Sequence, residues 1–364
     1  MHILHVVGAR PNFMKAAPVL RAFASHSSVR QSLIHTGQHY DAAMSDVFWA
    51  QLEMPQPDVN LGVGSGTHAQ QTAAVMIALE PLLVERKPDL VLVYGDVNST
   101  LAAALVSSKL SIPVGHVEAG LRSGDRSMPE ETNRLVTDQL SEFLFTPSAD
   151  ANDNLVREGI EPGKIQLIGN VMIDTLVRLL PQAEKLNHQE AQPYVLVTLH
   201  RPSNVDDLPW LRELVTKLTE LSARMNVVFP VHPRTRSRIS ELGINHGSSR
   251  LQLLDPLPYL EFLALQRYAA LVITDSGGIQ EETTFLGIPC LTVRENTERP
   301  ITIEQGTNQL VGRDLERLRR AADAILDGQL VEKDSAENVG RKQCSVPLWD
   351  GHASERLAQV VLRG

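Results

Sequence analysis

Cysteine is scarce in this sequence, with only Cys290 and Cys344 among 364 residues. Two thiols so far apart form neither the disulfide framework of a small secreted domain nor a cysteine-based metal site. Cys290 also lies within an apolar run, residues 288–293. We therefore expect a reducing, cytoplasmic location.

Long apolar runs are absent as well. No stretch of the sequence approaches the ~18 or more apolar residues that a membrane helix needs. Residues 1–7 are too few and too weakly basic for a signal peptide, so we interpret them as the first strand. We expect no association with a membrane.

Positive charge is in deficit, because 34 Lys and Arg residues stand against 43 Asp and Glu residues, a formal net charge of −9. This balance argues against a nucleic-acid or anionic-lipid partner, and a phosphate-bearing ligand would have to be met by local basic groups. Apolar residues at 43% and charged residues at 21% are ordinary for a globular protein. The length favours two domains, since single cores stop growing beyond roughly 250 residues.

Short apolar, β-branched runs alternate with longer helical patterns in the first half of the chain. This alternation is typical of βαβ units and parallel sheets. Prolines at 88 and 113 end helices before the next strand. The expected strands are 3–7, 90–94, 113–117, 143–146 and 165–168, and the expected helices are 15–25, 70–85, 100–110 and 131–142.

A polar segment, residues 180–193, interrupts the pattern and is interpreted as a linker or a solvent-facing helix. A second series follows, with strands expected at 194–198, 227–231, 251–254, 270–274 and 289–293 and helices at 208–223, 259–264 and 279–286. We predict an α/β protein of two doubly wound, Rossmann-like domains, residues 1–175 and 176–346, that face each other across a cleft. Ligand contacts are expected at the carboxyl ends of the strands.

Polar, ionisable and small residues follow most of the expected strands. Their accumulation at one end of both sheets is hard to explain from structural needs alone, and points to ligand binding there. The segments are 8–15, 95–100, 118–125, 200–202, 232–234 and 275–282.

Segment 275–282 joins a strand to a helix that should begin at about Ile279. Ser276, Gly277 and Gly278 let the backbone pass close to a ligand, and the helix N-terminus favours a phosphate. Glu282 is suited to accept hydrogen bonds from two ribose hydroxyls. The alternative is a capped helix with an acidic first turn, but the motif favours a nucleotide.

Segment 8–15 is another strand-to-helix turn, and it carries Arg10 and Lys15. It lacks the glycine spacings of a dinucleotide-binding fold and of a P-loop. The two cations suit a diphosphate, or they are ordinary surface charges.

The glycine-rich stretch at 62–67 does not follow a clear strand. We therefore interpret it as a turn and not as a phosphate loop. Ser65 or Thr67 is expected to cap a helix that begins near His68.

Three carboxylates stand out in the first half. Asp96 and Glu118 end buried strands, where partial desolvation raises a carboxyl pKa. Glu130 begins a helix after Pro129, where compensation of the helix dipole is an alternative role, and Asp96 is alternatively a cap for the helix at Ser99. Together the three suit removal and return of a proton on a sugar.

His200 follows the first strand of the second series and precedes Arg201. It is placed to donate a hydrogen bond to a departing phosphate, or it serves only to hold its loop. His232 lies in a different loop, and no Cys-x-x-Cys spacing occurs, so we expect no metal.

Eight segments form a distinctive set: GARPNFMKAAP (8–18), TGQHYD (36–41), GDVNST (95–100), HVEAGLRSGDRSMPEETNR (116–134), VTLHRPSNVD (197–206), FPVHPRT (229–235), TDSGGIQEETT (274–284) and RENTERP (294–300). This set resembles the non-hydrolysing UDP-N-acetylglucosamine 2-epimerases. The likeness runs from residue 3 to about 312, in the family's order, and the combination is highly specific.

The resemblance implies the two-domain glycosyltransferase-B architecture with an active site between the domains. It also implies a homodimer, a UDP-sugar substrate, and neither a nicotinamide cofactor nor a metal. The family's C-terminal helix usually packs on the first domain, which assigns residues 347–364 to that domain.

The implied reaction interconverts UDP-N-acetylglucosamine and UDP-N-acetylmannosamine. UDP is eliminated with the C2 proton to give 2-acetamidoglucal, and readdition delivers a proton to the opposite face of C2. The resemblance implies that Asp96, Glu118 and Glu130 are the acid/base residues and that His200 faces the diphosphate. Implied ligands of the phosphates or sugar-nucleotide are Arg10, Lys15 and Arg299, with Ser276, Gly277 and Gly278 at the helix end and Glu282 at the ribose.

Two departures from the family pattern stand in this sequence. Asn12 occupies a position where many members carry glutamate, and residues 64–73 lack the usual arginine, which argues against activation by substrate. A 2,3-diacetamido uronic acid sugar is an alternative substrate. The alternative activities are a hydrolysing epimerase, a glycosyltransferase on the same architecture, and a non-catalytic sensor, against which the three carboxylates argue.

Overall fold

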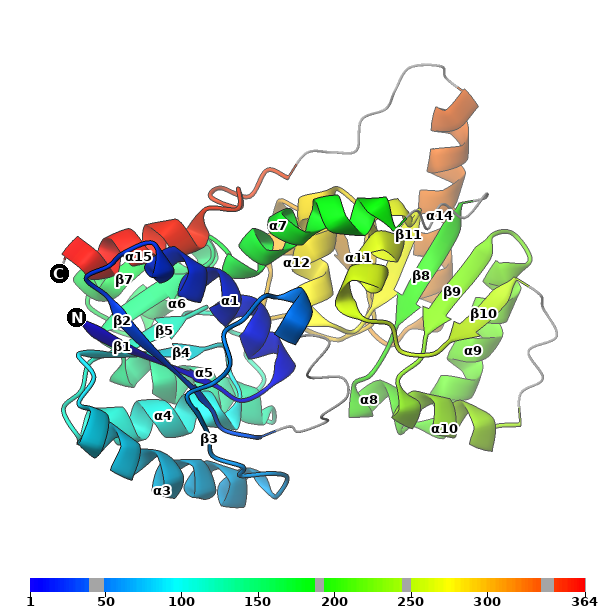
Figure 1. Ribbon diagram of the computed structural model, residues 1–364. Coiled ribbons are helices and arrows are strands. Elements are labelled where there is room, and N and C mark those ends of the chain that lie inside the picture. Colours follow the sequence, from blue (N-terminus) through cyan, green and yellow to red (C-terminus); the bar gives the residue numbers. More distant parts are fainter. Residues whose placement is uncertain (39–48, 187–192, 244–249, 335–343, 364) are drawn as a thin grey trace. The chain divides into compact units, whose positions relative to one another are not determined.

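The computed structural model describes residues 1–38, 49–186, 193–243, 250–334 and 344–363 (Figure 1). The chain divides into two compact units. Unit 1 comprises Met1–Arg178 and Pro347–Gly364, and unit 2 comprises Leu179–Val346. Across the described ranges, no helix combines the length and apolar character that a membrane crossing needs.

Unit 1 is built on a parallel sheet. In its described residues the strand order is β3-β2-β1-β4-β5-β6-β7. The direction of winding reverses between β1 and β4, and doubly wound sheets bind ligands at the carboxyl ends of the strands beside such a reversal. The strands are β1 His2–Val7, β2 Arg30–His35, β3 Val59–Asn60, β4 Leu90–Tyr94, β5 Val114–Val117, β6 Phe143–Thr146 and β7 Ile165–Leu167.

Helices cover the sheet of unit 1. Helices α3, α4 and α5 pack side by side, and α1 packs against α15 (Figure 1). Leu4 and Val6 of β1 share one apolar core with Leu79 and Ala103 from the α3–α4 layer. The helices are α1 Arg10–Ala24, α3 His68–Arg86, α4 Asn98–Lys109, α5 Pro129–Leu140, α6 Ala149–Arg157, the 3-10 turn η1 Pro162–Lys164, α7 Val171–Lys185 and α15 Ala353–Arg363.

The C-terminal helix α15 is tied to unit 1 by polar contacts. The buried Asp174 carboxylate of α7 accepts hydrogen bonds from Ala353 N at 3.0 Å and from Ser354 N at 2.7 Å. Just before the helix, Trp349 Nε1 donates to Pro147 O at 2.9 Å. Asp174 thus satisfies backbone donors that the first turn of α15 leaves free.

Unit 2 repeats the same plan. In its described residues the parallel strands follow the order β10-β9-β8-β11-β12-β13, which reverses between β8 and β11. Apolar residues of β8, β9 and β11 pack with α9 and α14 in one core. The strands are β8 Tyr194–Thr198, β9 Asn226–Pro230, β10 Leu251–Leu254, β11 Leu271–Thr274, β12 Cys290–Thr292 and β13 Asn308–Leu310. The helices are α8 Pro202–Val205, α9 Leu208–Ser222, α10 Pro233–Glu241, α11 Tyr259–Tyr268, α12 Gly277–Leu286, α13 Ile301–Glu304 and α14 Leu315–Asp334.

The α/β prediction is confirmed, and every expected strand is present with ends within one residue of those expected. The sequence did not reveal β2, β3 or β13, because β2 carries polar residues at four of its six positions and the other two strands span only two or three residues. The helical interpretation of residues 180–193 is confirmed as far as Lys185, with most side chains exposed there. Residues 187–192 lie outside the described residues, as do residues 39–41 of the TGQHYD segment.

Several helices start earlier than expected, and the difference is largest for the first helix. The first helix begins at Arg10 instead of residue 15, so Arg10 and Lys15 lie on α1 and not in the turn before it. Pro11 near the helix start pre-sets the backbone of the first turn, which explains the earlier beginning. The turn at 62–67 is confirmed: Thr67 caps α3, its Oγ1 accepting from Gln70 N at 3.3 Å.

Candidate active site

Lys15 of α1 forms an ion pair with Glu118, the residue that follows β5. Both side chains are buried, 5% and 6% exposed, so the interpretation of Lys15 as a surface charge is wrong. Gly95 makes room for the pair, because a Cβ there would lie 2.6 Å from Lys15 Nζ. The ion pair compensates both buried charges at the carboxyl end of the sheet.

The backbone at Glu118 is held in an unfavourable conformation. Its φ of 74° lies in the left-handed region, which residues with a Cβ seldom adopt. Glu118 N and Ala119 N both donate to Phe145 O, at 3.0 and 3.1 Å, and hold the turn in place. Backbone strain of this kind collects at functional sites.

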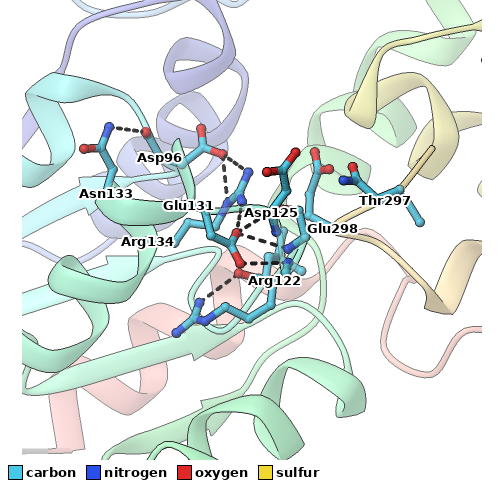
Figure 2. Close-up of polar contacts among 12 residues, drawn as sticks. Asp96, Arg122, Asp125, Glu131, Asn133, Arg134, Thr297 and Glu298 are labelled. Carbon is cyan, nitrogen blue, oxygen red and sulfur yellow. Dashed lines mark hydrogen bonds and ion pairs between the residues drawn. The ribbon is translucent and has the colours of Figure 1, made fainter. Parts of the chain in front are cut away.

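Asp96 is bound by an arginine from α5. Arg134 donates to Asp96 Oδ2 from Nε at 3.0 Å and from Nη2 at 2.6 Å, as Figure 2 shows. Asn133 Nδ2 donates to the Asp96 carbonyl oxygen at 2.8 Å. Helix α4 has Val97 at its N-cap position and no side-chain cap there, so the interpretation of Asp96 as a helix cap is wrong.

Two adjacent glutamates at the start of α5 have different surroundings. Glu131 is buried and accepts hydrogen bonds from Ser123 N at 3.1 Å, Gly124 N at 2.9 Å and Arg134 Nη1 at 2.5 Å (Figure 2). Burial alone would raise the pKa of Glu131, but these donors outweigh it and hold the pKa below its ordinary value. Glu130 is only half-buried, and its carboxylate has no hydrogen-bond or ion-pair partner among the described residues. Glu130 is therefore the member of the pair with a carboxyl group available to a ligand.

Asn12 braces the turn that precedes Arg10. Its Oδ1 accepts from Gly8 N at 3.0 Å and Ala9 N at 3.1 Å, and its Nδ2 donates to Tyr94 O at 2.7 Å. A glutamate carboxylate lacks the N–H that the last contact needs. Arg10 is half-buried, and no other described residue engages its side chain by a hydrogen bond or ion pair.

In unit 2, His200 lies at the end of β8 beside Asp275, which follows β11. His200 Nδ1 lies 3.0 Å from Asp275 Oδ1, and half of the His200 side chain is exposed. Arg201 N donates to the same carboxylate at 3.0 Å and Asn204 Nδ2 at 3.1 Å. An imidazole that donates from Nδ1 to a carboxylate has a fixed ring orientation and presents Nε2 to its surroundings.

Asp275 is fully buried, and burial alone would raise its pKa. The neighbouring His200 ring and the N–H donors of Arg201 and Asn204 outweigh burial and hold the pKa of Asp275 below its ordinary value. Asp275 is therefore a charged acceptor that orients His200.

Helix α12 begins at Gly277, two residues before the expected start, and Ser276 occupies its N-cap position. The requirement for glycine at 277 is steric, because a Cβ there would lie 2.5 Å from Arg299 Nη1 and 2.7 Å from Glu298 Oε1. Arg299 is buried, with Nε 2.9 Å from Glu281 Oε1 and an ion pair to Glu298. Its guanidinium is thus already balanced by two carboxylates beside the start of α12.

Glu282 is buried inside α12 and not in its first turn, so the interpretation of an acidic first turn is wrong. Its Oε1 accepts a hydrogen bond from the Tyr259 hydroxyl at 2.9 Å. Burial raises the pKa of Glu282 to about 7, although the Tyr259 hydroxyl acts in the opposite direction. The contact with a ribose stays a prediction.

Most of the predicted site residues follow a strand or lie near the N-terminus of a later helix in each unit, while Glu282 lies further inside α12. The residues in unit 1 are Arg10, Lys15, Asp96, Glu118 and Glu130, and those in unit 2 are His200, Ser276, Gly277, Gly278, Glu282 and Arg299. Sequence reasoning missed Arg134, Glu131 and Asp275, although Asp275 directly follows a buried strand, which was the available signal. Among the described residues, no group of three or more His, Cys, Asp or Glu side chains is arranged to hold a metal ion.

Two doubly wound parallel sheets with charged and polar side chains at their carboxyl ends define a class of α/β proteins that bind nucleotide-containing ligands. Residues 21–362 match the family model described as UDP-N-acetylglucosamine 2-epimerase. The chain is 41% identical to the UDP-N-acetylglucosamine 2-epimerase of Methanocaldococcus jannaschii, covering 100% of both chains. It therefore belongs to the UDP-N-acetylglucosamine 2-epimerase family.

Solved structures agree with this assignment. The M. jannaschii UDP-GlcNAc 2-epimerase in complex with UDP-GlcNAc and UDP superposes with a TM-score of 0.89, at 41% identity and with full coverage of both chains. A UDP-2,3-diacetamido-2,3-dideoxy-D-glucuronate 2-epimerase from Pseudomonas aeruginosa is also 41% identical, covering 100% of both chains. The glycosyltransferase of kitacinnamycin, at 13% identity and a TM-score of 0.61, shares the fold alone.

Proposed function

We propose that this protein interconverts UDP-N-acetylglucosamine and UDP-N-acetylmannosamine by inversion at C2. The observation that carries the proposal is the full-length likeness, at 41% identity, to an M. jannaschii epimerase whose structure holds UDP-GlcNAc and UDP. The charged side chains at the strand ends of this chain supply the groups that such a reaction needs.

The reaction proceeds by elimination and readdition. The C1–O bond to UDP breaks, the C2 proton leaves, and a C1–C2 double bond forms to give 2-acetamidoglucal. UDP then adds back at C1 while a proton arrives at the opposite face of C2. The protein therefore has to stabilise a departing diphosphate and to hold a base and an acid on opposite faces of the sugar.

Unit 1 supplies the proton-transfer groups in this proposal. The ion pair with Arg134 favours the charged form of Asp96, which suits a base that removes the C2 proton. Glu130, whose carboxyl group has no partner among the described residues, suits the acid that returns a proton. Glu118 is the third acid/base carboxylate. It forms an ion pair with Lys15 and lies in the strained turn after β5.

Unit 2 supplies most of the UDP contacts, and Arg10 and Lys15 of unit 1 add to them. The N-terminus of α12, with Ser276 at its N-cap position and Gly277 as its first residue, offers backbone N–H groups and a positive dipole end to a phosphate. His200, oriented by Asp275, donates from Nε2 to the leaving diphosphate. Arg10, Lys15 and Arg299 supply positive charge, and Glu282 binds the ribose.

Proton NMR of the purified protein with UDP-GlcNAc in deuterated water tests this proposal. We expect UDP-ManNAc to appear and deuterium to enter C2 of both sugars, with Asp96→Asn as the matched control that slows both. Free ManNAc with UDP would instead identify a hydrolysing epimerase. An absence of C2 exchange would contradict the proposal and favour a glycosyltransferase.

A second sugar has a specific observation in its favour. The P. aeruginosa relative named for UDP-2,3-diacetamido-2,3-dideoxy-D-glucuronate is as similar to this chain as the M. jannaschii enzyme is. The ratio of kcat/KM for the two UDP-sugars decides between them. We expect UDP-GlcNAc to be preferred, and a higher kcat/KM for the uronate would reassign the substrate.

We also propose that the protein is a cytoplasmic homodimer. The described residues include two large apolar side chains exposed on α3, Ile77 at 74% and Val84 at 54%, and such side chains on one helix suit burial by a second copy. The cytoplasmic location rests on the two cysteines, which form no disulfide.

Light scattering coupled to gel filtration tests the homodimer. We expect a mass twice the 40.1 kDa of one chain, falling to one chain in an Ile77→Asp/Val84→Asp variant. Val156→Asp on α6 is the matched control, because Val156 is 53% exposed but lies on another helix. A monomeric wild type would contradict the proposal.

A further inference from the structure

His116 of β5 is completely buried, and both of its ring nitrogens have close partners. Nε2 lies 2.8 Å from Gly95 O, and Nδ1 lies 2.6 Å from Asp138 Oδ1. A carbonyl oxygen only accepts, so Nε2 must carry a hydrogen. The short contact on the other side also requires a hydrogen between Nδ1 and the carboxyl group.

Asp138 of α5 is the charged partner in that contact. Its Oδ2 lies 2.7 Å from Arg122 Nη2 and accepts from Gly120 N at 3.1 Å. Burial alone would raise the pKa of Asp138, but His116 and Arg122 outweigh it and hold the pKa below its ordinary value. Two donors, Arg122 Nη2 and Gly120 N, already face Asp138 Oδ2, and this geometry favours the carboxylate form of Asp138 with the hydrogen of the short contact on His116 Nδ1.

The same ring joins the three elements that carry the acid/base carboxylates. Gly95 directly precedes Asp96 at the end of β4. Gly120, held by Asp138, comes two residues after Glu118 at the end of β5. Asp138 itself lies on α5, the helix that begins with Glu130 and carries Arg134.

Both glycine turns are tightly constrained. Gly95 and Gly120 have φ values of 61° and 81°, and a Cβ on Gly120 would lie 2.5 Å from Ala151 O. The backbone conformations at Gly95 and Gly120 therefore help to determine where Asp96 and Glu118 lie. Loss of the His116 ring would leave Gly95 O without this partner, and loss of the Asp138 carboxylate would leave Gly120 N without its acceptor.

We propose that His116 is a positioning residue, held as a buried imidazolium, that fixes the turns bearing Asp96 and Glu118 relative to helix α5. This inference rests on the proposed function for its catalytic consequence. Its structural half, the doubly protonated ring between Gly95 O and Asp138, stands on the contacts alone. His116 touches no substrate in this scheme and acts only through the carboxylates.

Nitrogen-15 NMR of the histidine rings in the full-length protein tests the protonation state without any substrate. We expect His116 to show hydrogens on both ring nitrogens at pH 7. His5 is the internal control: it is equally buried in the neighbouring part of the sheet, it contacts the Tyr94 hydroxyl, and burial lowers its pKa to about 3, so its ring is neutral. A neutral His116 ring would overturn the inference.

Two variants test the positioning role. In His116→Gln the side-chain amide can donate to Gly95 O, but its oxygen then faces the Asp138 carboxylate. We expect kcat to fall by about 10- to 100-fold through misplaced carboxylates, with little change in the dissociation constant for UDP, which unit 2 binds. The double variant His116→Gln/Asp138→Asn restores a donor opposite that oxygen, and we expect it to recover part of kcat.

His5→Gln is the matched mutational control, since it also removes a buried histidine from unit 1. We expect it to lower the melting temperature but to leave kcat close to wild type at a temperature where all variants are folded. Equal kcat losses in His5→Gln and His116→Gln would show a merely structural role and overturn the inference. A wild-type protein without C2 exchange would contradict the proposed function alone, because the ring spectrum still decides the state of His116.

Discussion

Arg134 places two nitrogens against one oxygen of Asp96, with Nε at 3.0 Å and Nη2 at 2.6 Å from Oδ2. Its third nitrogen, Nη1, donates to the buried Glu131. One guanidinium on α5 thus fixes the orientation of a strand-end carboxylate and is itself fixed by the start of its own helix. The other oxygen of Asp96 points away from this contact (Figure 2).

Replacement of either partner should slow catalysis to different extents. Asp96→Asn removes the proposed base, and we expect kcat to fall by about two to four orders of magnitude. Arg134→Lys keeps the charge but loses the two-nitrogen contact, and we expect a loss of about 10- to 100-fold. The C2 exchange rate in deuterated water measures both. Near-normal exchange in Asp96→Asn would remove Asp96 from the acid/base set.

The neighbours Glu130 and Glu131 should respond in opposite ways to the same substitution. Glu130→Gln removes a carboxyl that has no partner in the described part of the chain, so we expect kcat to fall by about two to four orders of magnitude with an unchanged melting temperature. Glu131→Gln breaks a buried ion pair, and we expect a destabilisation of about 3 kcal/mol. Urea unfolding and steady-state kinetics on the two variants separate these roles. A stable, inactive Glu131→Gln variant would exchange the two assignments.

Glu282 should make the stability of unit 2 depend on pH. The folded carboxyl has a pKa of about 7, above its ordinary value near 4.3, so the folded state keeps a proton that the unfolded chain releases. The stabilisation is present in full below about pH 4 and is lost as the pH rises to 7, by at most about 4 kcal/mol. We expect Glu282→Gln to remove this decline in urea unfolding between pH 4.5 and 7.5. Glu304→Gln, an exposed glutamate of α13, is the control and should keep the decline.

A shorter side chain at the same position tests the ribose contact. Glu282→Ala removes both carboxyl oxygens beside Tyr259. We expect the inhibition constant for UDP to rise by about tenfold, because one charge-assisted hydrogen bond to the ribose is lost. Turnover at saturating substrate should change less. An unchanged constant for UDP would remove the ribose role from Glu282.

The fold and the residues that follow each strand were predictable because they depend on periodic and local signals. Buried parallel strands are continuous apolar runs, and the residues that follow them, such as Asp96 and His200, can be read directly from the sequence. The partners of those residues were not predictable. Arg134 lies 38 residues from Asp96 and Asp275 lies 75 residues from His200, and only the parallel strand order brings such pairs together. The surface-charge alternative for Lys15 was wrong for the same reason, since the burial of this side chain depends on a glycine at position 95.

Asp275 and His200 should behave as one functional unit. Asp275 is charged and buried, and its carboxylate lies 3.0 Å from His200 Nδ1. The same carboxylate accepts hydrogen bonds from three N–H groups of the segment after β8, those of His200 N, Arg201 N and Asn204 Nδ2. An amide in place of the carboxylate would turn an N–H toward one of these donors, so the His200 ring would lose its fixed orientation. We expect Asp275→Asn to lower kcat by about 100-fold, close to the loss caused by His200→Gln.

A double-mutant cycle measures whether the two losses share one cause. If Asp275 acts through His200, then Asp275→Asn should cost little further activity in a His200→Gln background, and the two free-energy losses should not add. The dissociation constant for UDP and the melting temperature serve as controls for collapse of the loop after β8. Fully additive losses, with all four proteins folded, would show that Asp275 acts on catalysis by a route that does not pass through His200.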